Sequence, residues 1–424
     1  MGETMQDTTP NTATTGAPSA VPAPMRERAV FVFLNIGHAL DHLFMLLFPT
    51  VVLTLEEVWK RPYQELLPLS LGGFIAFGAG ALPSGWLGDR WSRRHMMTVF
   101  FIGIGLASML TGLAEGPWGL GLGLALIGLF ASIYHPVGTA MVAQGAGETV
   151  GRRIGINGVA GNLGVAAAAL TAGGLAALWG WRAAFVVPGA VAIAAGIVFH
   201  LLTGNGWEAA AKARGKASTH AHPGMDYRKL FALFAAITLL NGLIFNGTLV
   251  GMPKVFDIRM EGLALGSLGV SGLVSVIYVV GAFSQILVGY LLDRHPLRSV
   301  LILVSLLQIP FLLLASNMAN LPLLAISCMM MFTVFGVIPI QDTLIARTVT
   351  DAWRSRVYAV KYLVGLGVSP LAVSMVSLVY SATAEFVWLF MIFATLSLLV
   401  MLGALLLPRG IALPTRLATA QSGG

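Results

Sequence analysis

The chain has 424 residues, of which 57% are hydrophobic and only 10% are charged, and its formal net charge is +7. Soluble globular chains carry about a quarter charged residues, so this composition excludes an ordinary soluble protein and indicates a polytopic membrane protein. The single cysteine excludes a disulfide framework or a thiolate metal cluster within one chain. We expect the positive charge to reflect membrane topology and not binding to nucleic acid.

In chain order, the first element is residues 1–28, which are rich in Thr, Pro and Ala and have no apolar run. This composition predicts a disordered leader, and the segment lacks the basic start and short apolar middle of a cleavable signal peptide. Twelve apolar runs follow, each long enough for a membrane helix, which needs about 20 residues. We predict spans at 29–55, 66–87, 96–115, 118–143, 153–178, 183–203, 229–253, 265–291, 298–316, 320–346, 356–381 and 385–407.

The basic residues are distributed unevenly between the two sides of these spans. Most of the 25 Lys and Arg residues fall in the leader, the tail and the loops on the same side as the chain ends. Lys and Arg are enriched in cytoplasmic loops, so the distribution predicts that both termini are cytoplasmic. We therefore expect a multi-pass protein of the bacterial inner membrane.

Two loop sequences resemble each other, GWLGDRWSRRH at 85–95 and GYLLDRHPLRS at 289–299. Each follows the second span of its set of six, which indicates an internal duplication. Duplicated membrane proteins of this kind are typically transporters that alternate access to a central site. We predict an all-α membrane protein with a cytoplasmic leader (1–28), two pseudo-symmetric six-helix bundles (29–203 and 229–407), a cytoplasmic linker (204–228) and a cytoplasmic tail (408–424).

The first loop has the pattern GxxxDRxxRR and resembles the signature loop of the major facilitator superfamily, which repeats it where the second copy stands. The resemblance extends from about residue 29 to 407 and implies the major facilitator fold. It also implies a gating role for Gly85, Asp89, Arg90, Arg94, Asp293 and Arg294. Gly85 would let helices approach closely, and Asp89 would pair with an arginine or a helix N-terminus. The plainer alternative is that the basic residues only anchor the loop on the positive side.

Shorter elements resemble the fosmidomycin-resistance-like branch of bacterial permeases, although Asp41–His42 stands where that branch has Asn–Asp and Val137 replaces an acid. The elements are GHALDH (37–42), ASIYHPVGTAMVA (131–143), AGNLG (160–164) and Gln341–Asp342. This resemblance implies export driven by the proton gradient.

The first span carries a polar stripe, because Asn35, His38, Asp41 and His42 fall within an arc of about 120° at 100° per residue. A charge facing lipid costs about 3 kcal/mol or more, so the stripe should face protein or a water-filled cavity. We predict that Asp41, His38 and His42 couple proton movement, since an ordinary histidine titrates near pH 6.5. The alternatives are a structural hydrogen-bond network, or a transition-metal site completed by His135.

Further polar residues lie inside the other spans. We predict that the substrate is bound by Asn35, His135, Asn162, Asn241, Asp342 and Lys361. Pro136, next to His135, should loosen the fourth span, because proline lacks a backbone N–H. For Lys361, one interpretation is that its side chain reaches the cytoplasmic surface, and the alternatives are anchoring an anion or pairing with Asp342.

Together these features predict a proton-coupled secondary transporter, and not an enzyme, that moves a small organic solute of anionic or drug-like type. We expect a monomer without a cofactor whose partners are the solute, protons and the lipid bilayer. The chain lacks a GxxxxGK[ST] phosphate loop, which argues against ATP as the driving force. The alternative function is a transition-metal or metal-complex permease that uses His38, Asp41, His42 and His135. A haem-holding redox protein and a substrate sensor are further alternatives of other classes.

Overall fold

The computed structural model describes residues 23–143, 150–203, 227–263, 266–349, 357, 360–365 and 367–408. All the regular elements in these ranges are helical. The first group of helices is α1 (Ala23–Trp59), α2 (Tyr63–Leu66), α3 (Leu71–Arg90), α4 (Arg93–Gly112), α5 (Pro117–Ala131), α6 (Thr139–Ala143), α7 (Val150–Trp179) and α8 (Ala183–Thr203). The second group is α10 (Tyr227–Arg259), α11 (Gly266–Arg294), α12 (Leu297–Ala315), α13 (Asn320–Thr348), α15 (Ser369–Thr383) and α16 (Val387–Leu406).

Twelve helical stretches in the described part of the chain, some of which join several of these elements, are long and apolar enough to cross a membrane. They correspond one for one to the twelve predicted spans, which confirms the all-α transmembrane fold class. The main difference in boundaries is at α1, which begins at Ala23 and so includes residues that we predicted to be disordered leader. Pro24 suits the first turn of a helix, because its missing N–H would have no helical partner there.

The fourth predicted span is not one regular helix. It runs from α5 through a single turn of π-helix at Tyr134–Gly138 into α6. Pro136 lies inside this turn, so the predicted loosening at the proline is confirmed. The wider turn is the element that carries His135.

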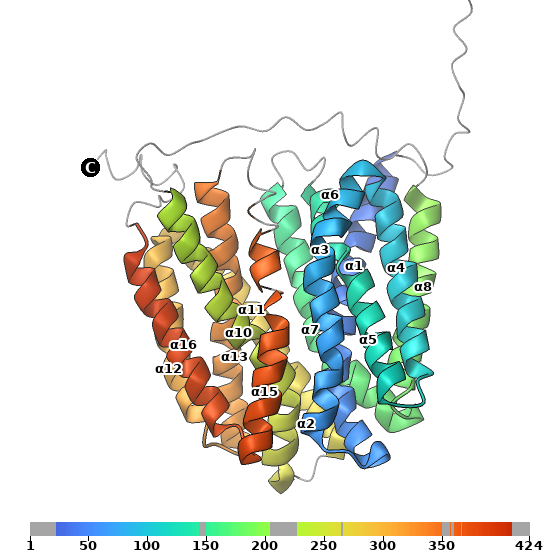
Figure 1. The fold of residues 1–424 in the computed structure, drawn as a ribbon. Helices are drawn as coiled ribbons and strands as arrows, with labels where there is room; N and C mark the ends of the chain where they lie inside the picture. The colour runs from blue at the N-terminus through green and yellow to red at the C-terminus, as the bar shows by residue number, and fades with distance from the viewer. Residues whose placement is uncertain are drawn as a thin grey trace, which may run out of the picture.

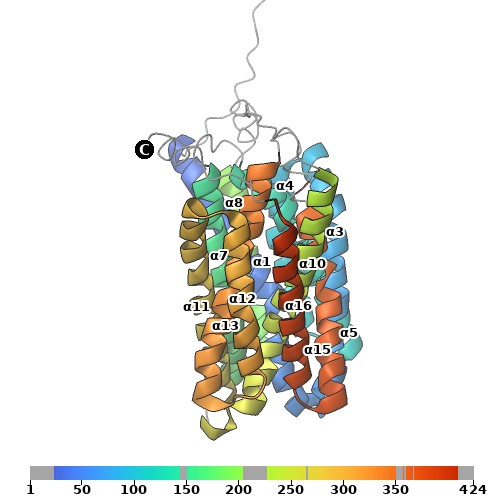
Figure 2. The same cartoon turned by 90° about the vertical axis from the view of Figure 1, so that its left-hand side faces the viewer.

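The helices form two groups that lie side by side, with α1–α8 in one and α10–α16 in the other (Figure 1). Within the first group α1 packs on α7 and α4 on α8, and within the second α11 packs on α13 and α12 on α16. Figure 2 shows the second group in front of the first. The predicted limits of the bundles stay predictions, and the linker and the tail after residue 408 lie outside the described residues.

The start of α1 and the end of α16 lie at the same end of the molecule, at the top of Figure 1. We call this end the terminal face and the other end the opposite face. The groups touch near the opposite face, where Ser377 Oγ of α15 donates to the Gln64 carbonyl of α2 over 2.9 Å. Deeper in the molecule, α7 and α11 meet where the Leu170 N–H donates to Ser275 Oγ over 3.0 Å.

Candidate functional site

A cavity of about 870 Å³ lies between the two groups of helices. Its walls come from the middle of α1, α10 and α13 and from the terminal-face parts of α7 and α11. The predicted site residues that line it are His38, His42, His135, Asn162, Asn241, Asp342 and Lys361. Asn35 and Asp41 are not among its lining residues. Because the groups touch nearer the opposite face, the cavity belongs to the terminal-face half of the protein.

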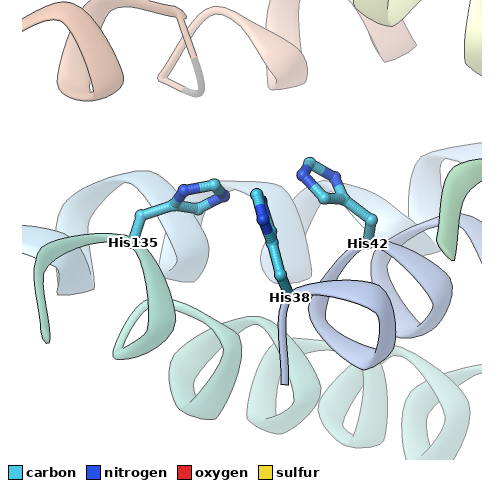
Figure 3. Close-up of side chains that lie close together, drawn as sticks. All are labelled: His38, His42 and His135. Atoms are coloured by element: carbon cyan, nitrogen blue, oxygen red, sulfur yellow. The ribbon is translucent and has the colours of Figure 1, made fainter. Parts of the chain in front are cut away.

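Three imidazoles converge at the wall of the cavity (Figure 3). His38 and His42 are one helical turn apart on α1, so they share a face, and His135 reaches them from the π-helical turn. The ring centroid of His38 lies 5.0 Å from that of His42 and 5.3 Å from that of His135. One ligand atom from each of the three histidines lies within 4.8 Å of the others. The sequence predicted a shared face for His38 and His42 and raised His135 as a further ligand, and the fold brings the three rings together.

His38 is held in one orientation by α7. Its Nδ1 lies 2.7 Å from the carbonyl oxygen of Asn157, and because a carbonyl only accepts, Nδ1 carries the proton in the neutral ring. The Tyr134 ring stacks on His38 with centroids 4.8 Å apart. The other nitrogen, Nε2, is buried and has no hydrogen-bond partner among the described residues. In this tautomer Nε2 of His38 therefore carries the lone pair and is the nitrogen able to accept a proton or bind a metal ion.

Asp41 is fully buried beside this cluster. Its Oδ2 lies 3.3 Å from Nε2 of His135, but neither carboxylate oxygen has a well-aligned hydrogen bond from the described residues. A buried carboxylate without donors is costly, so the site calls for a proton or a cation. Asp41 thus lies behind His135 and does not itself reach into the cavity.

Asn35, predicted to bind substrate, belongs to a network between α1 and α7. Its Oδ1 accepts from Nδ2 of Asn157 over 3.0 Å, and the Tyr134 hydroxyl donates to the Leu34 carbonyl over 2.7 Å. The hydrogen bond between Asn35 and Asn157 is of the kind expected if the polar stripe forms a structural hydrogen-bond network between helices. Asn157 and Tyr134 were not among the residues predicted from the sequence. The signal for Asn157 was that it is a second side-chain amide, beside Asn162, in the mostly apolar span 153–178.

On the other wall, Lys361 forms an ion pair with Asp342 of α13. This is the pairing that the sequence raised as one alternative for Lys361. The lysine side chain is 9% exposed and that of Asp342 is 32% exposed, so the carboxylate is the more accessible partner. Asn241 lines the same cavity and donates from Nδ2 to the Ile237 carbonyl of its own helix over 3.0 Å.

One aromatic contact joins the two walls. The rings of His135 and Tyr362 have centroids 4.7 Å apart and an interplanar angle of 32°. Tyr362 follows Lys361 in the chain, and the lysine Nζ lies 5.2 Å from its ring centroid. The histidine cluster with Asp41 and the Lys361–Asp342 pair are therefore adjacent across the boundary between the two groups.

The predicted gating residues lie at the terminal face, where α3 meets α4 and where α11 ends. Asp89 forms an ion pair with Arg93 over 2.7 Å. An arginine was one of the two partners expected for Asp89, the other being a helix N-terminus. Arg90 lies over the Trp86 ring and Arg294 over the Tyr290 ring. Asp293 is exposed at the end of α11.

Arg94 and Gly85 have contacts of a different kind. Arg94 is buried and donates to Oγ1 of Thr203 and to the His200 carbonyl, both over 2.8 Å, which satisfies the C-terminal end of α8. A Cβ added at Gly85 would lie 3.2 Å from Cβ of Pro136, which fits the expected close approach of helices. The gating role of all six residues stays a prediction.

The metal alternative keeps three of its four expected ligands. The convergent group consists of His38, His42 and His135, whereas Asp41 contacts His135 from behind. A carboxylate in that place orients a metal-binding histidine and does not bind the ion.

Comparison with known proteins gives a family. Residues 41–359 match the family model of the Major Facilitator Superfamily. A segment of 124 residues is 35% identical to the puromycin resistance protein pur8 of Streptomyces alboniger and covers 28% of this chain and 24% of that protein. The chain thus aligns with only about a quarter of the length of this curated relative.

The fold is similar to solved transporter structures. The crystal structure of a D-xylose–proton symporter superposes with a TM-score of 0.72 at 13% identity, covering 90% of this chain and 98% of that one. A bacterial homologue of the human lysosomal transporter Spinster, in an inward-facing and occupied conformation, gives a TM-score of 0.69 at 15% identity, covering 91% and 97%. At these identities the likeness concerns the fold alone.

Proposed function

Because the chain belongs to the major facilitator superfamily, and is thus a multi-pass membrane transporter of small molecules, we propose that it is a proton-coupled secondary transporter. The cargo is a small organic solute of anionic or drug-like type, and the protein works as a monomer. It resides in the bacterial inner membrane with both termini in the cytoplasm, as the basic residues on that side suggest. With that orientation the terminal face is cytoplasmic and the cavity belongs to an inward-facing conformation.

The observation that carries the coupling is the place of Asp41. Its carboxylate is fully buried and lies 3.3 Å from His135. The imidazoles of His38, His42 and His135 lie beside it, and all three line the cavity. A proton taken up from the cavity would reach Asp41 through His135, and would neutralise the buried carboxylate. The protonated and deprotonated forms then differ in charge beside the boundary between the two groups of helices. Protonation can therefore shift the equilibrium between the inward-facing and outward-facing conformations.

The cargo would bind in the cavity between this cluster and the Lys361–Asp342 pair. A volume of about 870 Å³ suits a drug-sized molecule, and the neutral amides of Asn162 and Asn241 supply hydrogen bonds. The pur8 relative is a puromycin resistance protein, so puromycin is the first compound to test, and export is the direction in which a transporter would confer such resistance.

The experiment measures proton movement in proteoliposomes that carry an imposed pH gradient and a pH-sensitive dye. We expect puromycin, or a solute found by thermal-shift screening of organic anions and drugs, to release protons down the gradient. Asp41→Asn should lower this signal by about tenfold or more, as removal of a proton-transfer group does, while the protein still folds. Glu65→Gln is the matched control, because that carboxylate is exposed at the opposite face. Unchanged driven flux in Asp41→Asn would refute the coupling role.

A second candidate cargo is a divalent transition metal or its complex, and the convergence of three imidazoles favours it. In that case Zn²⁺ or Co²⁺ should raise the melting temperature of the purified protein, and His38→Ala should abolish the effect. His295→Ala is the control, because His295 is exposed just after the end of α11 and is not among the cavity-lining residues. Metal-independent melting would leave the organic solute as the cargo class.

A further inference from the structure

Near the opposite face, one lysine connects the two groups of helices. Nζ of Lys254 on α10 lies 2.6 Å from Oε2 of Glu56 on α1 and 2.9 Å from Oδ2 of Asp257 on its own helix. Lys254 is only 7% exposed, so breaking one of these contacts matters more than at a surface pair. Glu56 belongs to the first group and Asp257 to the second.

Both partners of the inter-group contact have a second hydrogen bond within their own group. The other oxygen of Glu56, Oε1, accepts the backbone N–H of Tyr63 over 2.9 Å. Lys254 keeps Asp257, three residues along α10. If the groups separated here, neither charge would be left without a partner, so the main cost of breaking a buried ion pair would not arise.

The surroundings fit a contact that forms and breaks. A hollow of about 640 Å³ is lined by Glu56, Lys254 and Asp257, so water can reach these groups when they part. The rings of Tyr63 and Tyr380, one from each group, meet edge to face with centroids 5.4 Å apart. Nζ of Lys254 lies 5.6 Å from the first ring centroid and 5.8 Å from the second.

We propose that Lys254 is a switchable lock: it binds Glu56 while the opposite face is closed and remains with Asp257 when that face opens. Glu56 favours the closed conformation, because its contact exists only there. Asp257 favours the open conformation, because it is then the only carboxylate on the lysine. The inference rests on alternating access, as the proposed function does, but it depends neither on the cargo nor on proton coupling.

The two carboxylates therefore have opposite effects on the same equilibrium. Glu56→Gln weakens the closed state alone, so the fraction of protein open at the opposite face should rise. Asp257→Asn costs more in the open state, where Lys254 has no other carboxylate, so that fraction should fall. We expect each change to shift the ratio of the two conformations by at least about fivefold, the lower end of typical coupling between sites.

The test is a distance measurement by electron spin resonance on the full chain in nanodiscs. Spin labels replace Trp118 at the start of α5 and Leu321 at the start of α13, two exposed opposite-face positions in different groups, and Cys328→Ser removes the native thiol. Arg259→Met is the matched control, because Arg259 pairs with Glu385 inside the second group and should leave the distances unchanged.

Opposite shifts in Glu56→Gln and Asp257→Asn, with no shift in the control, support the lock. Shifts in the same direction, no shift in Glu56→Gln, or an equal shift in Arg259→Met would overturn it. Asp257→Ala provides the same comparison if Asp257→Asn does not yield folded protein. Proton flux is not measured here, so a failed lock and a failed coupling role remain distinguishable.

Discussion

Oδ2 of Asp41 lies 3.3 Å from Nε2 of His135, although the two residues belong to the first and fourth membrane spans. Along the chain, Asp41 has His38 and His42 as its nearest histidines. In the fold, its carboxylate instead contacts the histidine of the π-helical turn. A proton on its way from the cavity to Asp41 would therefore pass through His135.

This contact predicts that Asp41 and His135 act as one unit. His135→Asn should lower pH-gradient-driven flux by about tenfold or more, a loss typical of removing a proton-transfer group. Adding Asp41→Asn should then cause little further loss, because effects of residues in one network are not additive. A double-mutant cycle on the dye signal measures this, and independent, multiplying losses would contradict it.

Helical periodicity explains how far the sequence predicted the site. A repeat of 3.6 residues places His38 and His42 on one face of α1, and the apolar length of each run predicts the twelve spans. Pro136 also predicted the irregular turn in the fourth span, because a missing N–H breaks the helical pattern locally.

Contacts between helices could not be predicted in the same way. The contact between the rings of His135 and Tyr362 depends on the relative height and rotation of segments from different groups, which spacing along one chain does not encode. The same holds for Glu56 and Lys254, which the sequence presented only as charges near span ends. It also holds for Asp41, which shares the stripe of His38 but lies behind the cavity wall.

The close approach of α7 to α1 gives a second prediction. A Cβ at Gly164 would overlap the backbone of Ala39, so Gly164→Ala should lower the free energy of unfolding by about 1–3 kcal/mol, as overpacking does. Gly155 is the control on the same helix, because nothing lies within 4 Å of its added Cβ. Gly155→Ala should be neutral or stabilising, since alanine is the better helix former by about 1 kcal/mol. Thermal unfolding in detergent measures both, and equal effects would contradict the prediction.

The Lys361–Asp342 pair gives a third prediction. Each substitution removes the ion pair between the buried Lys361 and the partly exposed Asp342, so Lys361→Met and Asp342→Asn should each lower the melting temperature. The double variant should lose less free energy of unfolding than the two single variants lose in sum. The difference, which is the coupling energy, should be about 0.5–3 kcal/mol. Unfolding curves for all four proteins complete the cycle. Additive losses would show that the two side chains do not stabilise each other.

The last prediction concerns Glu385, which lies between the α15 and α16 spans at the opposite face. Partial burial raises the pKa of this carboxyl, but hydrogen bonds from Arg259 and from the Phe386 N–H, with the charge of Arg259, outweigh burial and hold its pKa below the ordinary value of 4.5. A carboxyl whose pKa is lower in the folded state stabilises the fold above the unfolded pKa, and this stability is lost as the pH falls through the folded pKa.

At neutral pH, Glu385→Gln should therefore melt at a lower temperature than the wild type. As the pH falls below about 4.5 the difference should shrink, because the wild-type carboxyl then takes up a proton and loses its advantage on Arg259. Glu65 supplies the control, because its ion pair with Arg61 is exposed. Glu65→Gln should change the melting temperature little at any of these pH values. A constant difference between Glu385→Gln and the wild type from neutral to acidic pH would show that the carboxylate does not stabilise the fold through its charge.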